Sequence, residues 1–518
     1  MKFSTLKGVR VLIASLFFFP LLLFFCDFAG LLPKQLHLLA HLQLVPALLS
    51  GSFLIIGILF LYTCLFGRVY CSMVCPMGIL QDVIAWFTRR GKKKNKKKRW
   101  YHYHKPYNIV RYSLLAICVI FLIIGITTPL LYLDPYSNFG RIGTNIFRPI
   151  VIEENNLLNW IAMQFNSYRF YQVTIRTITT ASFVIASVAF LLVSVLAILR
   201  GRLFCNTICP VGSFLGLISR FSVFRITVDE SKCNQCGVCS MACKAECINS
   251  KEGLIDHSRC VTCFNCLDRC TKNALSYSYK PISSNLKQQS GKKSTVNKSR
   301  RSFMATSAII AATVPVLPAW AKKDRPIDVS KLTPITPPGS KSLENFTKKC
   351  TACHLCVTHC PQQILKPAGF NFGFSYAFKP HMVFYEKAFC NYRCTTCSSV
   401  CPTGAIERLT PEEKKITQIG IAKFEKNRCI VYTDNTSCGA CSEHCPVQAV
   451  IMEPYDGGLT IPHVYEHLCI GCGGCESICP VRPIKAINVL ANEIHQTAQL
   501  PPEEDMKTIN EDELDFGF

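Results

Sequence analysis

Long apolar stretches alternate with short polar connections over the first 200 residues. Four of these stretches, at residues 9–32, 44–65, 109–133 and 177–199, are each close to the length of a bilayer-spanning helix, for which about 20 apolar residues suffice. Beyond residue 220 the apolar segments are shorter and lie between polar ones. The pattern predicts a four-span helical membrane domain at residues 1–220.

The polar connections differ in charge, and the difference predicts which side of the membrane each one faces. The run RRGKKKNKKKR at residues 89–99 is the most basic segment, and Arg200 and Arg202 follow the fourth stretch. The connections at residues 27–41 and 134–169 are far less basic. Because short loops rich in Lys and Arg stay in the cytoplasm, we expect a multi-pass protein of a bacterial inner membrane whose N-terminus and basic loop are cytoplasmic.

Cysteine spacing supplies the strongest chemical signal. Of 32 cysteines, 24 form six runs that follow or nearly follow the pattern C-x2-C-x2-C-x3-C. This spacing is typical of [4Fe–4S] ligands, in which three thiolates of a run bind one cluster and the fourth binds a neighbouring cluster. The expected cofactors are therefore six [4Fe–4S] clusters. A zinc ribbon does not need the third cysteine of each run, and disulfide scaffolds are typical of short secreted chains.

A formal net charge of +24 would suit nucleic-acid binding, since clustered Lys and Arg neutralise phosphates. The distribution of charge argues against it. Residues 341–518 carry 16 Lys and Arg against 20 Asp and Glu, so the positive excess lies in the membrane part and its linkers. We therefore expect no nucleic-acid partner.

Two cysteine runs follow the membrane domain and predict a compact two-cluster ferredoxin at residues 225–280. The expected ligands of its first cluster are Cys233, Cys236, Cys239 and Cys270. The expected ligands of its second cluster are Cys260, Cys263, Cys266 and Cys243. Cys247 stands four residues beyond Cys243 and competes with it as a ligand, and the proline that usually follows the fourth cysteine is missing from both runs. By the charge pattern, this domain is cytoplasmic.

Four further runs predict a four-cluster ferredoxin domain at residues 341–495. Its expected ligands, run by run, are Cys350, Cys353, Cys356 and Cys360; Cys390, Cys394, Cys397 and Cys401; Cys429, Cys438, Cys441 and Cys445; and Cys469, Cys472, Cys475 and Cys479. The second and third runs are irregular in spacing and adjacent in sequence. We therefore expect a nested arrangement, in which these two runs share ligands and the first and fourth share theirs, with sequential pairing as the alternative.

The first of these four runs also matches a different motif. The segment CTACH, ending at His354, has the C-x-x-C-H pattern of covalent haem attachment. Both of its cysteines are in frame with Cys356 and Cys360 of the cluster run. The cluster interpretation therefore accounts for the match and leaves His354 without a required role.

The second and fourth apolar stretches end in nearly the same sequence, GRVYCSMVCPMG at residues 67–78 and GRLFCNTICPVG at residues 201–212. Six positions are identical, which indicates an internal repeat, and we expect both motifs on the cytoplasmic side. The motif cysteines are Cys71, Cys75, Cys205 and Cys209. A tetrathiolate metal site, a redox dithiol and a small buried turn are all compatible with them.

A polar, lysine-rich segment at residues 281–299 is expected to be a flexible linker. It leads into SRRSFM and a weakly apolar run, and residues 300–321 resemble a twin-arginine export signal, with a short fifth span as the alternative. Export would place residues 322–518 outside the inner membrane. The acidic tail at residues 496–518 is expected to be solvated and disordered.

The order of these parts resembles a fusion of two known families. The membrane part and the inner ferredoxin are similar to the NapH-type membrane quinol dehydrogenases, a four-span group shared with NosR-type and CcoG-type proteins, through the motifs at residues 67–78 and 201–212. The signal and the last four runs are similar to the exported ferredoxins of the NapG/MauM type. The resemblance completes the expected fold class: membrane α-helical, with four spans plus a signal-like fifth, and two α+β ferredoxin-like iron–sulfur domains.

The resemblance also implies a function. It implies transfer of electrons from the membrane quinone pool, with quinol as donor, through [4Fe–4S] clusters toward an extracytoplasmic reductase or haem electron carrier. The chain would then be the quinol dehydrogenase-type subunit of an oxidoreductase system. The main alternative is an iron–sulfur or metal-reducing helper in the assembly of a respiratory metalloenzyme, and a redox sensor is a third.

Two features of the electron path stay open in the sequence. The two ferredoxin domains would face opposite sides of a hydrocarbon core about 30 Å thick, and no protein-borne relay is evident. Diffusing quinone, a separate haem subunit or independent donors would each account for this gap. His102 with His104, and His37 with His41, are candidate acceptors of quinol protons, and a solvated or interfacial role explains them equally.

Overall fold

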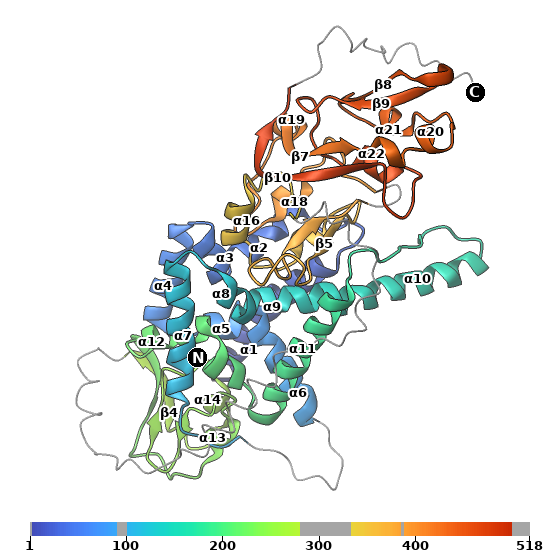
Figure 1. Cartoon of the computed structure of the whole chain (residues 1–518). Helices are drawn as coiled ribbons and strands as arrows, with labels where there is room; N and C mark the ends of the chain where they lie inside the picture. The colour runs from blue at the N-terminus through green and yellow to red at the C-terminus, as the bar shows by residue number, and fades with distance from the viewer. Residues whose placement is uncertain (1–2, 91–100, 280–332, 385–387, 500–518) are drawn as a thin grey trace, which may run out of the picture.

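The computed structural model describes residues 3–90, 101–279, 333–384 and 388–499. A helical bundle forms the centre of the molecule, with a small domain of short strands and helices against one end and a larger one at the other end (Figure 1). The chain thus combines many helices with small two-stranded sheets. The predicted linker, the export signal and nearly all of the acidic tail lie outside the described residues.

Two of the four predicted spans are single long helices, α1 (Phe3–Cys26) and α11 (Thr180–Arg200). Both contain a segment long and apolar enough to cross a bilayer. The second predicted span is interrupted by Gly51, whose φ of +72° lies in the left-handed region. This residue separates α3 (Leu44–Leu49) from α4 (Phe53–Phe66).

The third predicted span is interrupted in the same way. Gly125, with a φ of +87°, follows α7 (Asn108–Ile123) and precedes α8 (Thr128–Leu133). Glycine adopts this conformation without steric cost and so ends a helix readily. Four spans are therefore not shown by the described residues, because the second and third apolar stretches form shorter helices.

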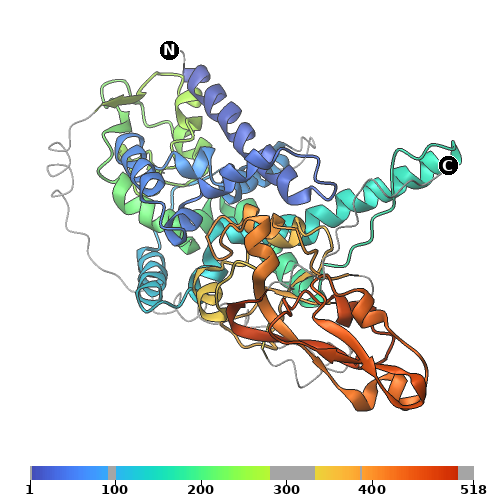
Figure 2. The same ribbon diagram turned by 90° about the horizontal axis from the view of Figure 1, so that it is seen from above.

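The remaining bundle helices include α6 and α10, of 15 and 17 residues, and several shorter ones. They are η1 (Lys34–His37), α2 (Leu38–His41), α5 (Tyr70–Met73), α6 (Pro76–Arg90), α9 (Pro135–Ile142), the π-helical η2 (Gly143–Phe147), α10 (Arg148–Gln164), the π-helical η3 (Phe204–Ile208) and α12 (Pro210–Ser219). Pro76 and Pro210 each open a helix directly after a motif cysteine, where a missing N–H breaks no helical hydrogen bond. Helix α10 extends out of the bundle to one side in both views (Figures 1 and 2).

The smaller domain, here called the inner ferredoxin, is built on one antiparallel strand pair. Strand β1 (Phe224–Val228) pairs with β4 (Leu275–Tyr279), with Phe224 opposite Tyr279. Its other elements are α13 (Val238–Ala242), β2 (Ile248–Asn249), β3 (Leu254–Ile255) and α14 (Asn265–Arg269). Each of the two helices lies inside a cysteine run, so the helices bring the two runs together.

The larger domain, here called the outer ferredoxin, has a long antiparallel pair at its centre, β7 (Thr417–Phe424) with β10 (Ile487–Thr497). Its other strands are β5 (Leu365–Pro367), β6 (Pro380–Met382), β8 (Val450–Pro454) and β9 (Thr460–Val464). Its helices are α16 (Leu343–Lys349), α17 (Leu355–Thr358), α18 (Thr396–Val400), α19 (Pro411–Ile416), η7 (Lys426–Arg428), α20 (Ile430–Thr433), α21 (Ala440–Glu443), η8 (Asp456–Gly458) and α22 (Gly474–Ile478).

Helix α1 connects the two ferredoxin domains through the bundle. Near its start, Lys7 forms a 2.8 Å ion pair with Asp268 of the inner ferredoxin. Near its end, the ring of Phe24 packs at 4.2 Å from the ring of His359 in the outer ferredoxin. One continuous set of buried apolar side chains runs through the bundle and both domains. The two ferredoxin domains are therefore fixed at opposite ends of the same helix.

Candidate iron–sulfur sites

The regular cysteine runs share one backbone turn. The second residue after the first cysteine has a positive φ in four runs, at Gln235, Thr262, Ala352 and Gly471. The fourth residue after it does so as well, at Gly237, Phe264, His354 and Gly473. Such turns point backbone N–H groups at the cysteine sulfurs, as the 3.4 Å contact from the nitrogen of Ala352 to Sγ of Cys350 illustrates. Repeated N–H groups aimed at clustered sulfurs fit iron–sulfur ligation.

In the inner ferredoxin, the first predicted ligand set lies around one cavity. Its lining includes Cys233, Cys236, Cys239 and Cys270. Three of these cysteines come from the first run and one from the second, as expected for a crossed pair of runs. Cys236 is exposed, so this site opens to the surface of the domain.

The second predicted set contains a fifth thiol. Cys260, Cys263 and Cys243 all lie near Cys266, whose pKa is raised by burial and then by these neighbours. Cys247 is buried, and its Sγ lies 3.5 Å from Sγ of Cys243. Both cysteines therefore stand at this site, and the competition foreseen from the sequence is present in the fold.

In the outer ferredoxin, the first run pairs with the second. One cavity is lined by Cys360, Cys390, Cys394 and Cys397. Cys401 completes the other set, because it lies close enough to Cys350, Cys353 and Cys356 to raise their thiol pKa values, after the larger effect of burial. Helices α17 and α18, one from each run, pack against each other.

The third run pairs with the fourth in the same way. Another cavity is lined by Cys429, Cys438, Cys441 and Cys479. Cys445 lies beside the remaining cysteines and raises the pKa of each, again after burial; these are Cys469, Cys472 and Cys475. The structure therefore brings the four runs together sequentially, and the nested pairing predicted from the sequence is wrong. The irregular spacing of the third run reflects a local insertion, α20, between Cys429 and Cys438.

His354 occupies one of the positive-φ positions of the first outer run and is buried. Its Nε2 lies 2.9 Å from the carbonyl oxygen of Phe378, and its Nδ1 lies 3.4 Å from the side-chain nitrogen of Asn145. Burial lowers the pKa of the imidazole to about 3. The side chain therefore joins the outer ferredoxin to the bundle through its ring nitrogens.

The repeated motifs bring their four cysteines together in the bundle. Cys71, Cys75, Cys205 and Cys209 are all buried. Burial raises the pKa of Cys75, and the nearby thiols of Cys205 and Cys71 raise it further. Cysteines of the two motifs therefore lie close together. The backbone nitrogen of Gly212 lies 3.3 Å from Sγ of Cys209. Among the described residues, no group of His, Cys, Asp or Glu is spaced to hold a single metal ion.

Arginines of the two motifs bond across to each other's backbone. Nη2 of Arg68 donates to the carbonyl oxygen of Cys205 at 3.1 Å. Arg202 donates in the mirrored sense to the carbonyl oxygen of Cys71. Both arginines stand in the Gly-Arg pair that opens each motif, so the identical positions of the repeat could have indicated them, whereas the cysteine pattern alone did not.

A buried ionic cluster joins the second motif to the inner ferredoxin. The carboxylate of Asp82 pairs with Arg202 at 2.6 Å and with Arg10 and Lys244. Burial alone would raise the pKa of Asp82, but Arg202 and Lys244 hold it below its usual value. No sequence pattern pointed to Asp82, because its three partners come from distant parts of the chain.

The histidine pairs considered from the sequence lie in different places. Nε2 of His37 is 3.0 Å from Nη2 of Arg408 in the outer ferredoxin, and its ring packs on His41. Nδ1 of His104 is 2.9 Å from a carboxylate oxygen of Glu246 in the inner ferredoxin. The carbonyl oxygen of His102 lies 3.0 Å from Nδ1 of His104. Each pair therefore lies near a boundary between the bundle and a ferredoxin domain.

Comparison with known proteins bears on these sites directly. A 4Fe-4S binding domain family matches residues 48–95 and 182–228, and a 4Fe-4S dicluster domain family matches residues 436–484. The methylamine utilization ferredoxin-type protein MauM of Methylobacillus flagellatus is 30% identical over 167 residues, which cover 31% of this chain and 70% of that protein. The chain belongs to the ferredoxin-type family that includes MauM and NapG. The NapG protein of Escherichia coli is 30% identical over 165 residues, or 30% of this chain and 70% of NapG.

Other comparisons cover less. An uncharacterised protein of Methanocaldococcus jannaschii is 39% identical over 84 residues, which are 16% of this chain and 33% of that protein. No solved structure matches the chain. As a member of the MauM and NapG family with three matched 4Fe-4S segments, the chain is a ferredoxin-type electron-transfer protein that binds [4Fe–4S] clusters. The two matches to the first family model also coincide with the two copies of the internal repeat.

Proposed function

We propose that this protein is a membrane-bound subunit that passes electrons from quinol through its [4Fe–4S] clusters toward an extracytoplasmic reductase. The observation that carries the proposal is the succession of cysteine sets. Consecutive sets adjoin each other through the outer ferredoxin, where the backbone nitrogen of Cys390 donates to the carbonyl oxygen of Cys472 at 2.9 Å. This contact joins the first pair of runs to the second pair, so electrons have a continuous series of sites.

A membrane location is supported by the surface of the bundle. Helices α1 and α11 expose large apolar side chains such as Leu16 and Leu191, each 61% exposed. Helix α10 and the loop after it expose Trp160 at 61% and Tyr168 at 82%. Trp and Tyr are enriched at membrane interfaces. In this proposal α10 lies along the interface on the side of the outer ferredoxin.

The proposed quinol site is a cavity between the second motif and the inner ferredoxin. His104, Tyr107, Arg200, Asn206 and Glu246 are among its lining residues. Oxidation of a quinol to a quinone releases two electrons and two protons, so the site needs a base as well as an electron acceptor. The imidazole of His104 is held by the Glu246 carboxylate and is suited to accept one of the protons.

The proposal is tested on purified full-length protein in detergent. Iron and acid-labile sulfide are measured first, and EPR spectra are recorded before and after addition of a reduced menaquinol analogue. We expect about 24 iron atoms from the six ferredoxin sets, at four per set, and cluster reduction that depends on quinol. A full iron content with clusters that quinol does not reduce would rule out quinol as the donor.

A pair of variants tests the site itself. His104→Ala is expected to slow reduction by the quinol analogue without changing the iron content. His102→Ala, two residues away on the same segment and absent from the cavity lining, is the matched control and is expected to keep the wild-type rate. Equal rates of reduction in the two variants would show that the quinol site lies elsewhere.

A further inference from the structure

The repeated motifs lie between the two ferredoxin domains. At about 1.5 Å of rise per residue, the contacts of Lys7 and Phe24 with the two domains are roughly 25 Å apart along α1. Electron transfer between fixed centres falls off exponentially with distance, so a gap of this size needs an intermediate site. Helix α5, which carries Cys71, packs against α1 in this gap.

We propose that Cys71, Cys75, Cys205 and Cys209 together bind one iron–sulfur centre that relays electrons between the inner and outer ferredoxins. This inference rests on the proposed electron-transfer function and adds a seventh site to it. It also supplies the protein-borne path between the domains that the sequence alone did not reveal.

The number of thiols requires the two motifs to act together. A protein-bound [2Fe–2S] or [4Fe–4S] cluster is held by four thiolates. Each match to the 4Fe-4S binding domain model contains only one pair of motif cysteines, Cys71 with Cys75 or Cys205 with Cys209. Neither copy is a complete site, and the fold brings the two incomplete copies together. A single metal ion is a poorer match, because the described cysteines are not spaced for one.

The two copies are locked to each other at the site. A Cβ added at Gly78 would lie 2.3 Å from the carbonyl oxygen of Cys71 and 2.8 Å from Nη1 of Arg202. A Cβ added at Gly212 would lie 2.1 Å from the carbonyl oxygen of Cys205 and 2.8 Å from Nη2 of Arg68. Glycine at both positions therefore lets each arginine reach the opposite motif. The same construction occurs twice, as expected for one shared site.

Buried charge around the cysteines calls for an anion. Arg68 and Arg202 are 0% and 1% exposed, and Arg10 is also buried. Asp82 is the carboxylate that pairs with Arg10 and Arg202, and Arg68 forms no ion pair among the described residues. Buried charges are costly unless they are balanced. Four thiolates around iron carry net negative charge and would balance the excess.

A side-chain hydrogen bond also points at the site. Nε2 of Gln81 donates to Sγ of Cys205 at 3.1 Å, and Gln81 is fully buried. Nη2 of Arg68 lies 3.8 Å from Sγ of Cys71. Hydrogen bonds to ligand sulfurs raise the reduction potential of an iron–sulfur cluster, because they favour the more negative reduced form.

On the inner side, the connection runs through the ionic cluster. Lys244, which follows the cluster ligand candidate Cys243, accepts a backbone hydrogen bond at its carbonyl from the nitrogen of Arg202 at 3.0 Å. The side chain of Lys244 lies close to Cys263, and that of Arg202 lies close to Cys71 and Cys205. The segment around Lys244 therefore lies between the motif cysteines and the second set of cysteines in the inner ferredoxin.

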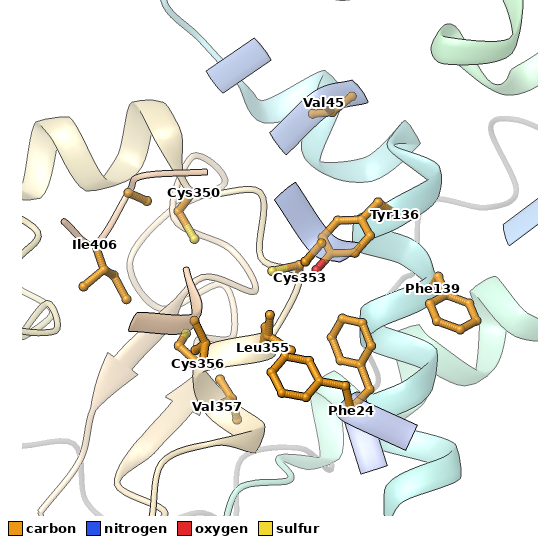
Figure 3. Close-up of a cluster of buried hydrophobic side chains, with 14 of the residues drawn as sticks. Phe24, Val45, Tyr136, Phe139, Cys350, Cys353, Leu355, Cys356, Val357 and Ile406 are labelled. Carbon is orange, nitrogen blue, oxygen red and sulfur yellow. The ribbon is translucent and has the colours of Figure 1, made fainter. Parts of the chain in front are cut away.

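On the outer side, two tyrosines and one carboxylate fill the gap. Tyr70 lies beside Cys75 and near Asp134. Tyr136 follows Asp134 by two residues and turns its hydroxyl toward Cys353 of the outer ferredoxin (Figure 3). All three side chains are buried or nearly so. The motif cysteines are thus joined by packed side chains to the first outer set.

Each transfer in this scheme moves one electron and makes or breaks no covalent bond. When the inner set that includes Cys263 loses an electron, the centre at the motif cysteines gains it. When the motif centre loses that electron, the outer set that includes Cys353 gains it. The reductant is the reduced inner ferredoxin, and the final oxidant is the acceptor of the outer ferredoxin.

The test uses full-length protein in sealed vesicles that are prepared so that the inner ferredoxin faces outward. Dithionite, which sealed vesicles exclude, is added outside, and rapid-freeze EPR follows the reduction of the clusters. In wild type we expect reduction of the inner signals and then of the outer signals. In Cys205→Ala with Cys209→Ala, we expect loss of about two or about four irons per chain, unchanged reduction of the inner signals, and outer signals that stay oxidised.

Controls separate the relay from other defects. Cys118→Ala removes a buried cysteine of α7 outside the motifs and is expected to leave the iron content and both rates unchanged. Wild-type iron content in the double variant, or wild-type reduction of its outer clusters, would overturn the proposal. Failure of quinol to reduce the wild-type protein would instead affect only the proposed donor, since dithionite bypasses it.

A second variant covers the case in which the double variant does not fold. Gln81→Leu keeps all four motif cysteines and removes the N–H group that faces Cys205. We expect the midpoint potential of one EPR signal to fall while the signals of the six ferredoxin sets keep theirs. If no signal shifts, Gln81 faces no redox centre and the assignment is wrong.

Discussion

Nη2 of Arg68 donates a hydrogen bond to the carbonyl oxygen of Cys205, 137 positions along the chain, at 3.1 Å. Arg202 makes the mirrored bond to Cys71, so each copy of the repeat holds the cysteine loop of the other. A bond of this kind fixes the relative position of the two loops, because both arginines are buried and cannot exchange their partners for water. The four motif cysteines are therefore held by side chains that lie outside the cysteine pattern itself.

The two glycines past which each arginine reaches the opposite motif, Gly78 and Gly212, are expected to tolerate no side chain. Gly212→Ala places a methyl group 2.1 Å from the carbonyl oxygen of Cys205, so the loop or Arg68 must move, at a cost of about 1–3 kcal/mol. The variant should melt at a lower temperature and lose the iron of the motif site. Gly57→Ala in α4, where the added methyl group meets nothing within 4 Å, is the matched control. Equal melting temperatures for the two variants would show that a side chain at position 212 does not collide with the Cys205 loop.

Asp82 is expected to be the most sensitive charged residue of the bundle. Asp82→Asn leaves Arg10, Arg202 and Lys244 without their shared carboxylate, and breaking a buried ion pair in this way costs about 3–5 kcal/mol. Thermal unfolding in detergent should show a large drop in midpoint. Glu344→Gln removes an exposed pair with Lys348 and is expected to leave the unfolding midpoint nearly unchanged, because solvent screens exposed ion pairs. Similar shifts of the unfolding midpoint in both variants would show that the ion pairs of Asp82 do not stabilise the fold.

The cysteine spacing predicted the local structure of the sites well. The pattern C-x2-C-x2-C imposes a tight turn, and the four regular runs share positive φ values at equivalent residues, such as Gln235 and Ala352. The crossing of ligands between paired runs also followed from the spacing, as the cavity with Cys270 among first-run cysteines illustrates. These features depend on a few neighbouring residues, which a sequence displays directly.

Pairing between runs could not be predicted, because it depends on which helices pack together. The irregular spacings at Cys390 and Cys429 suggested shared ligands, but Cys390 lies with Cys360 and Cys429 lies with Cys479. The interrupted helices were missed for a related reason. Hydropathy over residues 44–65 and 109–133 is continuous, whereas Gly51 and Gly125 adopt positive φ values that hydropathy does not reveal.

Sequential pairing in the outer ferredoxin makes a prediction of its own. Cys479→Ala removes a thiol from the set of Cys429, Cys438 and Cys441, and loss of a ligand loosens the chain that the cluster organises. Hydrogen exchange measured by mass spectrometry should therefore increase in α20 and α21. The nested alternative places the increase in α17 instead. Cys360→Ala is the matched control and should increase exchange around α18, since Cys360 faces Cys390, Cys394 and Cys397.

The outer ferredoxin is expected to lose stability in mild acid through His381. This residue of β6 packs its ring 5.2 Å from the ring of Phe372, and burial, aided by the charge of Lys366, lowers its pKa from 6.5 to about 4. Below pH 6.5 the unfolded chain binds a proton that the folded domain does not, so the free energy of unfolding falls with decreasing pH until about pH 4. Since one pKa unit corresponds to about 1.4 kcal/mol, the loss of unfolding free energy is at most about 3.5 kcal/mol.

His381→Gln isolates this contribution from the other titrating groups. The difference in unfolding free energy between wild type and the variant should be constant above pH 6.5 and should shift in favour of the variant between pH 6.5 and about 4. Chemical denaturation at several pH values, followed by far-UV circular dichroism, measures that difference. A difference that stays flat across this window would mean that His381 is protonated equally in the folded and unfolded states, and that its packing against Phe372 does not persist in solution.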